Sequence, residues 1–203
     1  MQTIIFATHN QNKFDEMKEI IKKIPEMENW NVISMTEAGI TEEIVEDGDT
    51  YEENALIKAR FVCQETGLPA LADDSGTEID ALYGAPGIYS ARFMEDKSYK
   101  EKCLAILDMM KNKDDRTAFF SCALTFIDKN RNIQKQFLAK TEGEIVNTYN
   151  EYEYGFGYDP IFYSYEAKAI FASIPTDEKF KYSHRGKANR LLVEYLKEYY
   201  IWK

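Results

Sequence analysis

The pattern of hydrophobic and polar positions changes its period along the chain, as expected for strands that alternate with helices. The run 3–7 is almost wholly apolar and predicts a buried strand near the N-terminus. Beyond it the apolar residues recur with the helical period, and Pro25 ends the predicted helix. The residues that share one face of this helix are Phe14, Met17, Ile20, Ile21 and Ile24.

The same patterns predict the remaining elements. We expect strands over 31–35, 117–127 and 133–141, and helices over 51–66, 98–111 and 187–200. A short strand at 70–72 is predicted to run into a turn at 73–76. The strands are interspersed with helices, and the last two predicted strands are joined as a hairpin. This order favours an α/β fold built on a mixed sheet with flanking helices. Because no stretch has the composition of a linker, we expect a single domain over residues 1–203.

The balance of charge narrows the class of partner. The chain has 25 basic and 35 acidic residues, a formal net charge of −10. Such a chain repels the phosphate backbone of nucleic acids, so DNA and RNA rank last among its partners. A small anionic substrate stays compatible, because a few cations or a bound metal can dominate the local field. No apolar run approaches the ~18 residues of a membrane span, and the three cysteines, which lack metal-binding spacing, indicate reduced thiols in the cytoplasm.

The segment Thr8–Lys13 lies at the junction of a predicted strand with a predicted helix. Unpaired backbone N–H groups and the positive end of the helix dipole make such a junction a phosphate site. Thr8 and Asn10 add polar groups there, and Lys13 adds a positive charge. The alternative is that Asn10 or Asn12 only caps the helix.

Acidic residues at two places are candidate ligands for Mg²⁺. Asp73 and Asp74 follow an apolar strand directly, where a carboxylate can bind a hard cation or take a proton from an attacking water. The alternative is an acidic turn whose aspartates cap the next element. The run Glu46–Asp49 either supplies a further ligand or is a solvated acidic loop.

Two stretches near the C-terminus offer contacts for a base. Gly155–Pro160 combines two glycines with the flat ring of Phe156, on which a base can stack. The alternative is a tight turn that packs the ring into the core. Ser183–Lys187 presents Arg185, a bidentate donor to oxygens, and His184, a donor or acceptor for a base edge. The helix dipole disfavours cations at that helix start, which favours a functional role for them.

Taken together and in this order, the motifs closely resemble the inosine triphosphatase family, the non-canonical purine nucleoside triphosphate pyrophosphatases. The matching stretches are Thr8–Lys13, Glu53–Ala59, Ala72–Gly76, Gly84–Arg92, Gly155–Pro160 and Ser183–Gly186. The resemblance implies a two-lobed α/β fold around a long mixed sheet, usually as a homodimer, with the active cleft between the lobes. It also implies Mg²⁺-dependent hydrolysis of ITP, dITP or XTP to the monophosphate and pyrophosphate, which cleanses the nucleotide pool.

The resemblance further implies roles for individual residues. Asp74 is the implied proton acceptor and, together with Glu46, the implied ligand of Mg²⁺. Phe156 is implied to stack on the purine. The other implied substrate contacts are Thr8, His9, Asn10, Gln11, Asn12, Lys13, Lys58, Ser75, Gly157, Tyr158, Asp159, Lys179, His184 and Arg185.

Two positions depart from the family pattern. His9, in the phosphate loop, stands where a small residue is more frequent. Ala139 stands where many members carry glycine, and this change concerns a local bend or the dimer contact. Two other functions stay open: a related pyrophosphatase for modified pyrimidine or methylated nucleotides, as in the septum-formation inhibitor proteins, and a nucleotide-binding module that senses without cutting.

Overall fold

The computed structural model describes residues 2–22, 25–27 and 29–199, so Ile24 and Tyr200 of the two predicted terminal helices lie outside the described residues. The chain divides into two compact units, each assembled from separate segments. Unit 1 comprises 1–74, 122–139 and 188–203, and unit 2 comprises 75–121 and 140–187. Three strands run from one unit into the other, namely β3 (Ala70–Ile79), β5 (Thr117–Asp128) and β6 (Ile133–Ile145).

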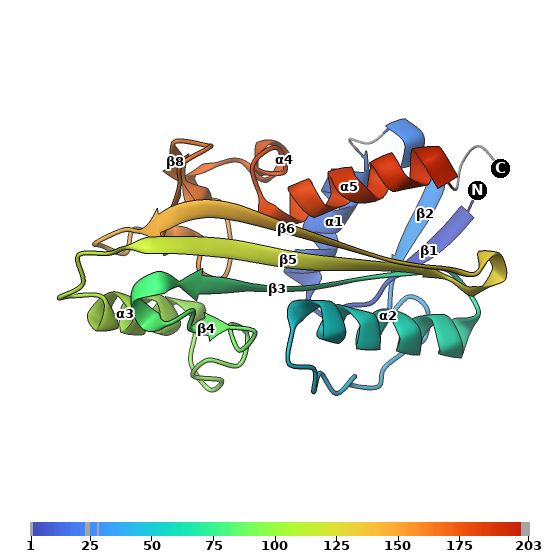
Figure 1. Ribbon diagram of the computed structural model, residues 1–203, viewed down its shortest axis with the longest axis horizontal. Coiled ribbons are helices and arrows are strands. Elements are labelled where there is room, and N and C mark those ends of the chain that lie inside the picture. Colours follow the sequence, from blue (N-terminus) through green and yellow to red (C-terminus); the bar gives the residue numbers. More distant parts are fainter. Residues whose placement is uncertain (1, 23–24, 28, 200–203) are drawn as a thin grey trace. The chain divides into compact units, whose positions relative to one another are not determined.

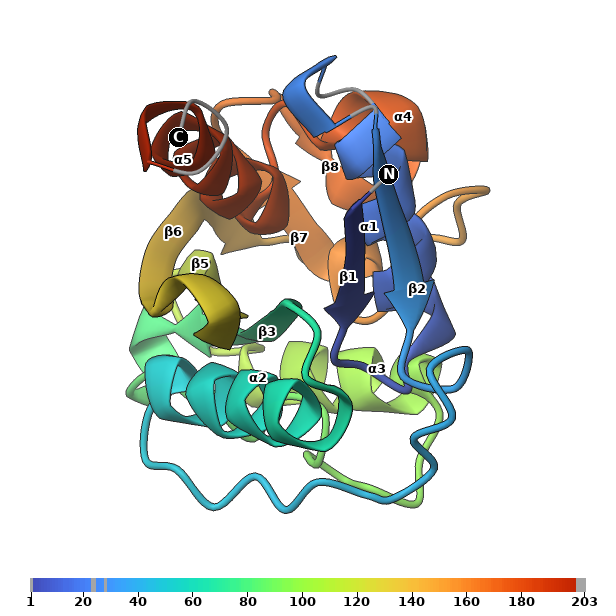
Figure 2. The ribbon, with the colours of Figure 1, turned by 90° about the vertical axis from the view of Figure 1, so that its right-hand side faces the viewer.

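Unit 1 is a sheet with helices on both faces. Strand β1 (Gln2–Phe6) pairs in parallel with β2 (Trp30–Ser34) on one side and with β3 on the other. Helices α1 (Gln11–Lys22) and α5 (His184–Tyr199) cover one face of these strands, and α2 (Tyr51–Thr66) covers the opposite face (Figure 1, Figure 2).

The wholly apolar run at the N-terminus is explained by these two covered faces. Because successive side chains of a strand point to opposite faces, a strand buried on both sides needs apolar residues throughout. Ile4 and Phe6 accordingly pack with Phe14 and Leu192, whereas Ile5 packs on the other side with residues of α2 such as Ala59 and Val62. The strand predicted over 3–7 is thus confirmed to within one residue.

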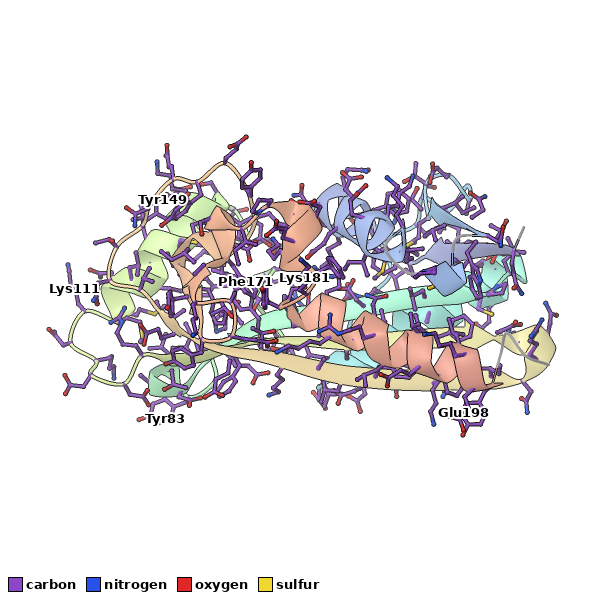
Figure 3. All side chains as sticks on the ribbon, turned by 90° about the horizontal axis from the view of Figure 1, so that it is seen from above. Tyr83, Lys111, Tyr149, Phe171, Lys181 and Glu198 are labelled. Carbon is purple, nitrogen blue, oxygen red and sulfur yellow. The ribbon has the colours of Figure 1, made fainter. Side chains whose placement is uncertain are left out.

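Unit 2 is built around one aromatic core. Its strands β4 (Pro86–Gly87), β7 (Phe162–Ser164) and β8 (Ala169–Ile170) pair antiparallel with β3, β6 and β7 respectively. The rings of Phe120 and Phe162 stack with centroids 4.0 Å apart, and the Phe171 ring meets them edge-on at 5.6 and 5.2 Å respectively. Cys103 and Ile106 of α3 (Tyr99–Met109) belong to the same core. In Figure 3 Phe171 lies among the side chains of this unit, whereas Tyr83 lies at its surface.

Short helical segments complete the chain. They are α4 (Thr176–Lys179) and the 3₁₀ helices Pro25–Met27, Asp80–Leu82, Lys129–Arg131, Asp159–Ile161 and Phe171–Ser173. Parallel pairs around β1 together with the antiparallel pair β6–β7 make the sheet mixed, so the predicted α/β class is confirmed. No helix among the described residues combines the length and the hydrophobicity that crossing a bilayer requires. All three cysteines are buried free thiols, as expected.

Capping residues explain why the two best predicted helices have their bounds. The Thr50 hydroxyl accepts the backbone N–H of Glu53 at 3.1 Å, and Gly67, in the left-handed conformation at φ 69°, ends α2. Ser98 and Glu101 form a capping box at the start of α3. Helix α2 matches its predicted bounds, and α3 begins one residue and ends two residues inside the predicted range.

The turn predicted at 73–76 is wrong, because β3 runs unbroken through it to Ile79. Neighbouring strands explain the difference. Strand β5 lies beside β3 in the sheet, and β4 pairs with it at Thr77 and Glu78, so ladder partners are available to the backbone of a polar sequence that would otherwise favour a turn. For the same reason β6 extends to Ile145, where it pairs with Phe162. Helix α5 begins at His184, three residues earlier than predicted.

Candidate active site

The phosphate-binding candidate lies at the switch point of the unit 1 sheet. The chain passes from β1 to β2 on one side of β1, and then to β3 on the other side of β1. Ligands of α/β sheets bind at such a switch point, beyond the carboxyl ends of the strands. The last paired residues are Phe6 and Leu71. Beyond them one strand continues into Thr8–Lys13 and the other into Asp73 and Asp74.

Side chains of the Thr8–Lys13 segment shape the start of α1. Asn10 accepts the backbone N–H of Lys13 at 3.2 Å and therefore caps the helix, while the Thr8 hydroxyl accepts the N–H of Asn10 at 3.1 Å. His9, exposed, hydrogen-bonds through Nε2 to the carbonyl oxygen of Glu42 at 3.0 Å. Gln11 donates to Asp15 at 2.7 Å. The cap that sequence alone offered as an alternative is present. Such a cap is compatible with phosphate binding by the other N–H groups of a first turn.

The two aspartates of β3 meet different helices. Lys13 of α1 lies 3.3 Å from Asp73 Oδ2, whereas Asp74 is contacted by α2, through Asn54 at 3.2 Å and Lys58 at 3.7 Å. Adjacent residues of a strand point to opposite faces, so continuing β3 through this sequence separates the two carboxylates. A cation held between Asp73 and Asp74 is therefore not favoured.

Glu46 is the carboxylate that accompanies Asp74. Lys58 Nζ lies 2.9 Å from Glu46 Oε2 and 3.7 Å from Asp74 Oδ1, so one positive charge is shared by both carboxylates. The Lys58 and Asp74 side chains are only 9% and 10% exposed, which strengthens their interaction by excluding water. Glu46 belongs to the acidic run whose role the sequence left undecided.

Burial and neighbouring charges have opposite effects on the pKa values of Asp74 and Lys58. Burial raises the pKa of Asp74 above its usual value, and the positive charges of Lys58 and Lys13 only partly oppose that rise. Burial by itself would lower the pKa of Lys58, but Asp74, Glu46 and Asp73 outweigh it and raise that pKa. Lys58 thus stays charged at neutral pH, while Asp74 is a carboxylate that takes up a proton more readily than an exposed one.

Asn54 is a site residue that the sequence argument missed. It is 0% exposed, and its amide bonds both Asp74 and the backbone N–H of Gly48. The available signal was its spacing: Asn54 and Lys58 are one helical turn apart on the otherwise apolar inner face of α2.

In unit 2 an ion pair supports the ring of Phe156. Asp159 Oδ2 accepts the backbone N–H of Phe156 at 3.0 Å and lies 2.7 Å from Lys179 Nζ. Lys179 Nζ is 5.4 Å from the centroid of the Phe156 ring, and the guanidinium carbon of Arg185 is 5.9 Å from it. Two cations therefore lie within cation–π range of one ring. Gly155 and Gly157, at φ 90° and 64°, allow the tight bend around it.

Arg185 links this ring to the residue after Asp74. Its side chain is buried, and Nη2 donates to the Ser75 hydroxyl at 3.2 Å. The helix that carries it is capped by Ser183, which accepts the N–H of Gly186 at 3.0 Å. His184 packs edge-on against Phe120 at 5.3 Å. Tyr158 is buried in the core and its hydroxyl donates to the carbonyl of Ser90 at 2.8 Å.

Comparison with known proteins identifies the family. The model of the Ham1 family matches residues 4–195, nearly the whole chain. The chain belongs to the Ham1 family. Its relatives include the dITP/XTP pyrophosphatase of Christiangramia forsetii, 42% identical over 95% of this chain and 98% of that protein. The dITP/XTP pyrophosphatase of Bacillus subtilis is 41% identical over 97% of this chain and 98% of that protein.

Solved Ham1 structures share the fold. A HAM1 protein from Coxiella burnetii superposes with a TM-score of 0.84 at 36% identity, and the match covers 98% of this chain and 100% of that chain. The Ham1 protein of Staphylococcus aureus gives 0.83 at 33% identity, with coverage of 97% and 99%. The resemblance drawn from the motifs is thereby confirmed.

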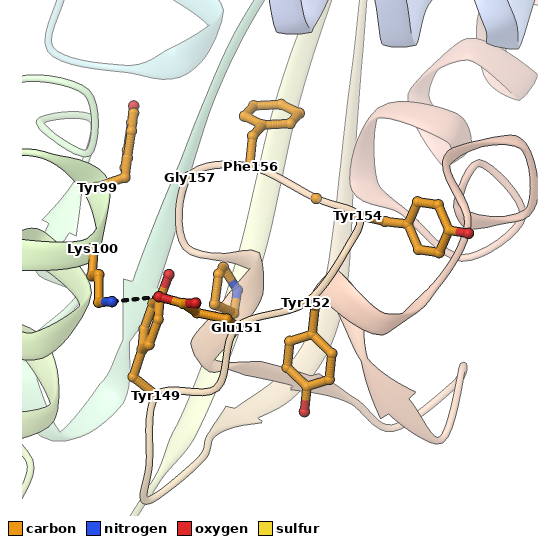
Figure 4. A pocket seen from close by; sticks show the side chains of 10 residues that line it. Tyr99, Lys100, Tyr149, Glu151, Tyr152, Tyr154, Phe156 and Gly157 are labelled. Atoms are coloured by element: carbon orange, nitrogen blue, oxygen red, sulfur yellow. Dashed lines mark hydrogen bonds and ion pairs between the residues drawn. The ribbon is translucent and has the colours of Figure 1, made fainter.

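This Ham1 protein also has a pocket of about 290 Å³ beside Phe156, within unit 2. In Figure 4 Lys100 of α3 points toward Glu151, with which it forms an ion pair, and the Tyr152 and Tyr154 rings point away from that pair. Because those two rings do not face a common centre, the pocket is an open approach to the Phe156 bend rather than an aromatic cage.

Proposed function

We propose that this Ham1 protein hydrolyses ITP, dITP and XTP to the nucleoside monophosphate and pyrophosphate. The observation that carries the proposal is a junction in β3. Asp74, a buried carboxylate held by Lys58 and Asn54, is followed directly by Ser75, which accepts from the Arg185 guanidinium beside Phe156. Asp74 and Ser75 are consecutive in the chain, so a residue proposed for phosphate chemistry is directly followed by one that contacts the group proposed for base recognition. The relatives named dITP/XTP pyrophosphatase support the same activity.

Asp74 is the proposed general base. It accepts a proton from the water that attacks the α-phosphorus, the bond from that phosphorus to the bridging oxygen breaks, and the electron pair leaves with pyrophosphate. A raised pKa suits this role, because a base is most effective when its pKa lies near the working pH. Lys13 and Lys58 stabilise the negative charge that develops on the leaving group, and the first turn of α1 holds the phosphates.

The donor set of Glu46 and Asp74 fits Mg²⁺. Both carboxylates already face one cation, the Lys58 ammonium, and Mg²⁺ in nucleotide sites is bound by one or two carboxylates plus phosphate oxygens and water. Among the described residues no group of three or more His, Cys, Asp and Glu side chains is placed to hold a metal, which agrees with a site completed by substrate. When bound, Mg²⁺ supplies charge neutralisation at the phosphates.

Phe156 is the proposed stacking surface for the purine. Asp159 fixes the backbone of Phe156 and holds Lys179 close to its ring. Cations beside the ring favour bases that present an oxygen: hypoxanthine and xanthine carry a 6-oxo group where adenine carries an amine. An adenine amine would leave a donor unpaired, which costs free energy in a buried site. Gly157, Tyr158 and His184 complete this wall in the proposal.

We also propose that the protein works in the cytoplasm as a homodimer. The side chain of Tyr83 is fully exposed at 100%, and that of Tyr89 is 60% exposed, so the loop that carries them offers aromatic surface to a second copy. Sedimentation equilibrium at micromolar concentration should give twice the mass of the chain.

Product analysis with ITP tests the function. We expect inosine monophosphate and pyrophosphate in the presence of Mg²⁺, and no turnover after EDTA treatment. A panel of ITP, XTP, dITP, UTP and 5-methyl-UTP distinguishes the purine specificity from the pyrimidine alternative. Release of orthophosphate with a diphosphate would contradict the proposed cleavage site, and binding of ITP without any cleavage would favour the sensing module.

A further inference from the structure

Helix α2 presents two polar side chains from an apolar face. Its other inner residues include Ala59, Val62 and Cys63, which pack under the sheet of unit 1, yet Asn54 is 0% exposed and Lys58 is 7% exposed among them. A buried amide is costly unless its donor and its acceptor both find partners. The hydrogen-bond partners of Asn54 therefore indicate which segments its side chain holds together.

The Asn54 amide joins the two acidic segments of the site. Its Nδ2–H donates to Asp74 Oδ2 at 3.2 Å, and its Oδ1 accepts the backbone N–H of Gly48 at 2.9 Å. The chemistry fixes this orientation, because a carboxylate only accepts and a backbone N–H only donates. Gly48 stands two residues after Glu46, so one side chain links Asp74 to the loop that carries the second carboxylate.

Lys58 makes the complementary link, but as a cation. Its ammonium lies against Glu46 at 2.9 Å and against the other oxygen of Asp74, Oδ1, at 3.7 Å. Glu46 and Asp74 are the carboxylates that would hold a divalent cation, and the charge of such a cation would repel this ammonium. The neutral amide of Asn54 contacts Oδ2 without such repulsion, so it would hold Asp74 in the same way with a metal bound.

We propose that Asn54 is a positioning residue that keeps Asp74 and the Glu46 loop in the metal-binding arrangement. The inference rests on the proposed function. Asn54 does not contact the nucleotide; it acts through Asp74 at one end of its amide and through Gly48 at the other.

Close packing at Gly48 gives a second, independent way to disturb this link. A Cβ added there would lie 2.6 Å from the Cβ of Glu53 and 2.9 Å from Oδ1 of Asn54. Gly48→Ala therefore requires a shift where Gly48 meets Glu53 and Asn54, and Asp74 is not among the three nearest contacts of the added Cβ. The two ends of the amide can thus be tested separately.

The experiment measures Mn²⁺ binding without nucleotide, by electron paramagnetic resonance of the free ion, for Asn54→Leu and Gly48→Ala. We expect the dissociation constant to rise about 10- to 100-fold in each, the range typical of lost partners of metal ligands. The Mg²⁺ concentration for half-maximal ITP hydrolysis should rise in parallel, whereas KM for ITP at saturating Mg²⁺ should change by less than about threefold. Gln136→Leu is the matched control, because the Gln136 amide also holds α2 but donates to the carbonyl of Glu52 and the hydroxyl of Thr125 rather than to a carboxylate.

The outcomes separate this inference from the proposed function. If Asp74→Asn abolishes Mn²⁺ binding while Asn54→Leu and Gly48→Ala bind it normally, the inference fails and the proposed site stands. If the unaltered protein binds no Mn²⁺ yet hydrolyses ITP in the presence of Mg²⁺, the inference fails and the proposed function stands; if it neither binds Mn²⁺ nor hydrolyses ITP, both fail. If Gln136→Leu weakened Mn²⁺ binding as much as Asn54→Leu does, any loosening of α2 would have this effect. That result would overturn the role given to Asn54. Should Asn54→Leu melt before assay temperature by circular dichroism, Gly48→Ala decides.

Discussion

At the scale of single residues, Asp74 has its two carboxylate oxygens in different surroundings. One oxygen accepts from the neutral amide of Asn54 and the other faces the ammonium of Lys58. Replacing the carboxylate by an amide keeps its shape, yet removes both the charge and the ability to take a proton. Substitution there therefore separates chemistry from folding.

We expect Asp74→Asn to lower kcat for ITP by two orders of magnitude or more, because a general base contributes about 10²- to 10⁴-fold and a metal ligand is lost as well. Binding of ITP, measured by equilibrium dialysis, should persist. Asp108→Asn, an exposed change on α3, is the control and should leave kcat unaltered. Near-normal hydrolysis by Asp74→Asn would refute the assignment.

The same variant should alter how stability depends on pH. Burial raises the pKa of Asp74 above its unfolded value, taken as 3.8, so the folded state holds this proton more tightly than the unfolded state does. The stability that this proton contributes is present below pH 3.8 and is lost as pH rises through the folded pKa. With a chelator present, Asp74→Asn should melt at or above the temperature of the unaltered protein at pH 7, and their difference should shrink toward pH 4. A melting temperature several degrees lower at pH 7 would contradict this.

Phe156→Ala should act on binding. Stacking of a base on an aromatic ring is worth ~1–3 kcal/mol, which corresponds to an increase in KM for ITP of about 5- to 150-fold. Phe156→Tyr keeps the flat face and should stay close to the original KM. A collapsed kcat with unchanged KM would contradict the stacking role.

At the scale of elements, the start of α5 depends on close packing. A Cβ added at Gly186 would lie 1.8 Å from the carbonyl oxygen of Phe180, so the helix cannot keep its place with any side chain there. Gly67, which ends α2 at φ 69°, has no atom within 4 Å of its added Cβ, so only backbone strain opposes a substitution.

We expect Gly186→Ala to cost several kcal/mol of unfolding free energy, within the range of severe overpacking. Gly67→Ala should cost only about 1 kcal/mol, the price of a left-handed conformation for a residue with Cβ. Urea unfolding followed by circular dichroism compares the two. Similar losses in both variants would show that the contact with Phe180 is relieved at little cost.

At the scale of the whole molecule, net charge sets the range of partners. A formal charge of −10 disfavours approach of a polyanion, whereas a single nucleotide needs only local cations such as Lys13, Lys179 and Arg185. We therefore expect no binding of a single-stranded or duplex oligonucleotide below about 10 µM at physiological salt, as measured by fluorescence anisotropy. Saturable binding in the low micromolar range would restore nucleic acid as a partner.

The sequence by itself determined the fold class, most element bounds and the family. Helices α2 and α3 were predictable because their capping residues act locally, at Thr50, Gly67 and Ser98. The apolar run of β1 was predictable because both of its faces are buried. The ordered motifs carried the family, since each contains the residue types that its chemistry requires.

Only the tertiary structure decided which partners the polar side chains contact. Asp73 to Gly76 favour a turn locally, and the neighbouring strands β4 and β5 make them part of β3 instead. That extension sends Asp73 toward Lys13 and Asp74 toward Lys58 and Asn54. A polar side chain in a sequence has no fixed partner, because hydrogen bonds and ion pairs act over a few ångströms and depend on which segments the fold brings together. For this reason the role proposed for Asn54 depends on the contact between α2 and β3.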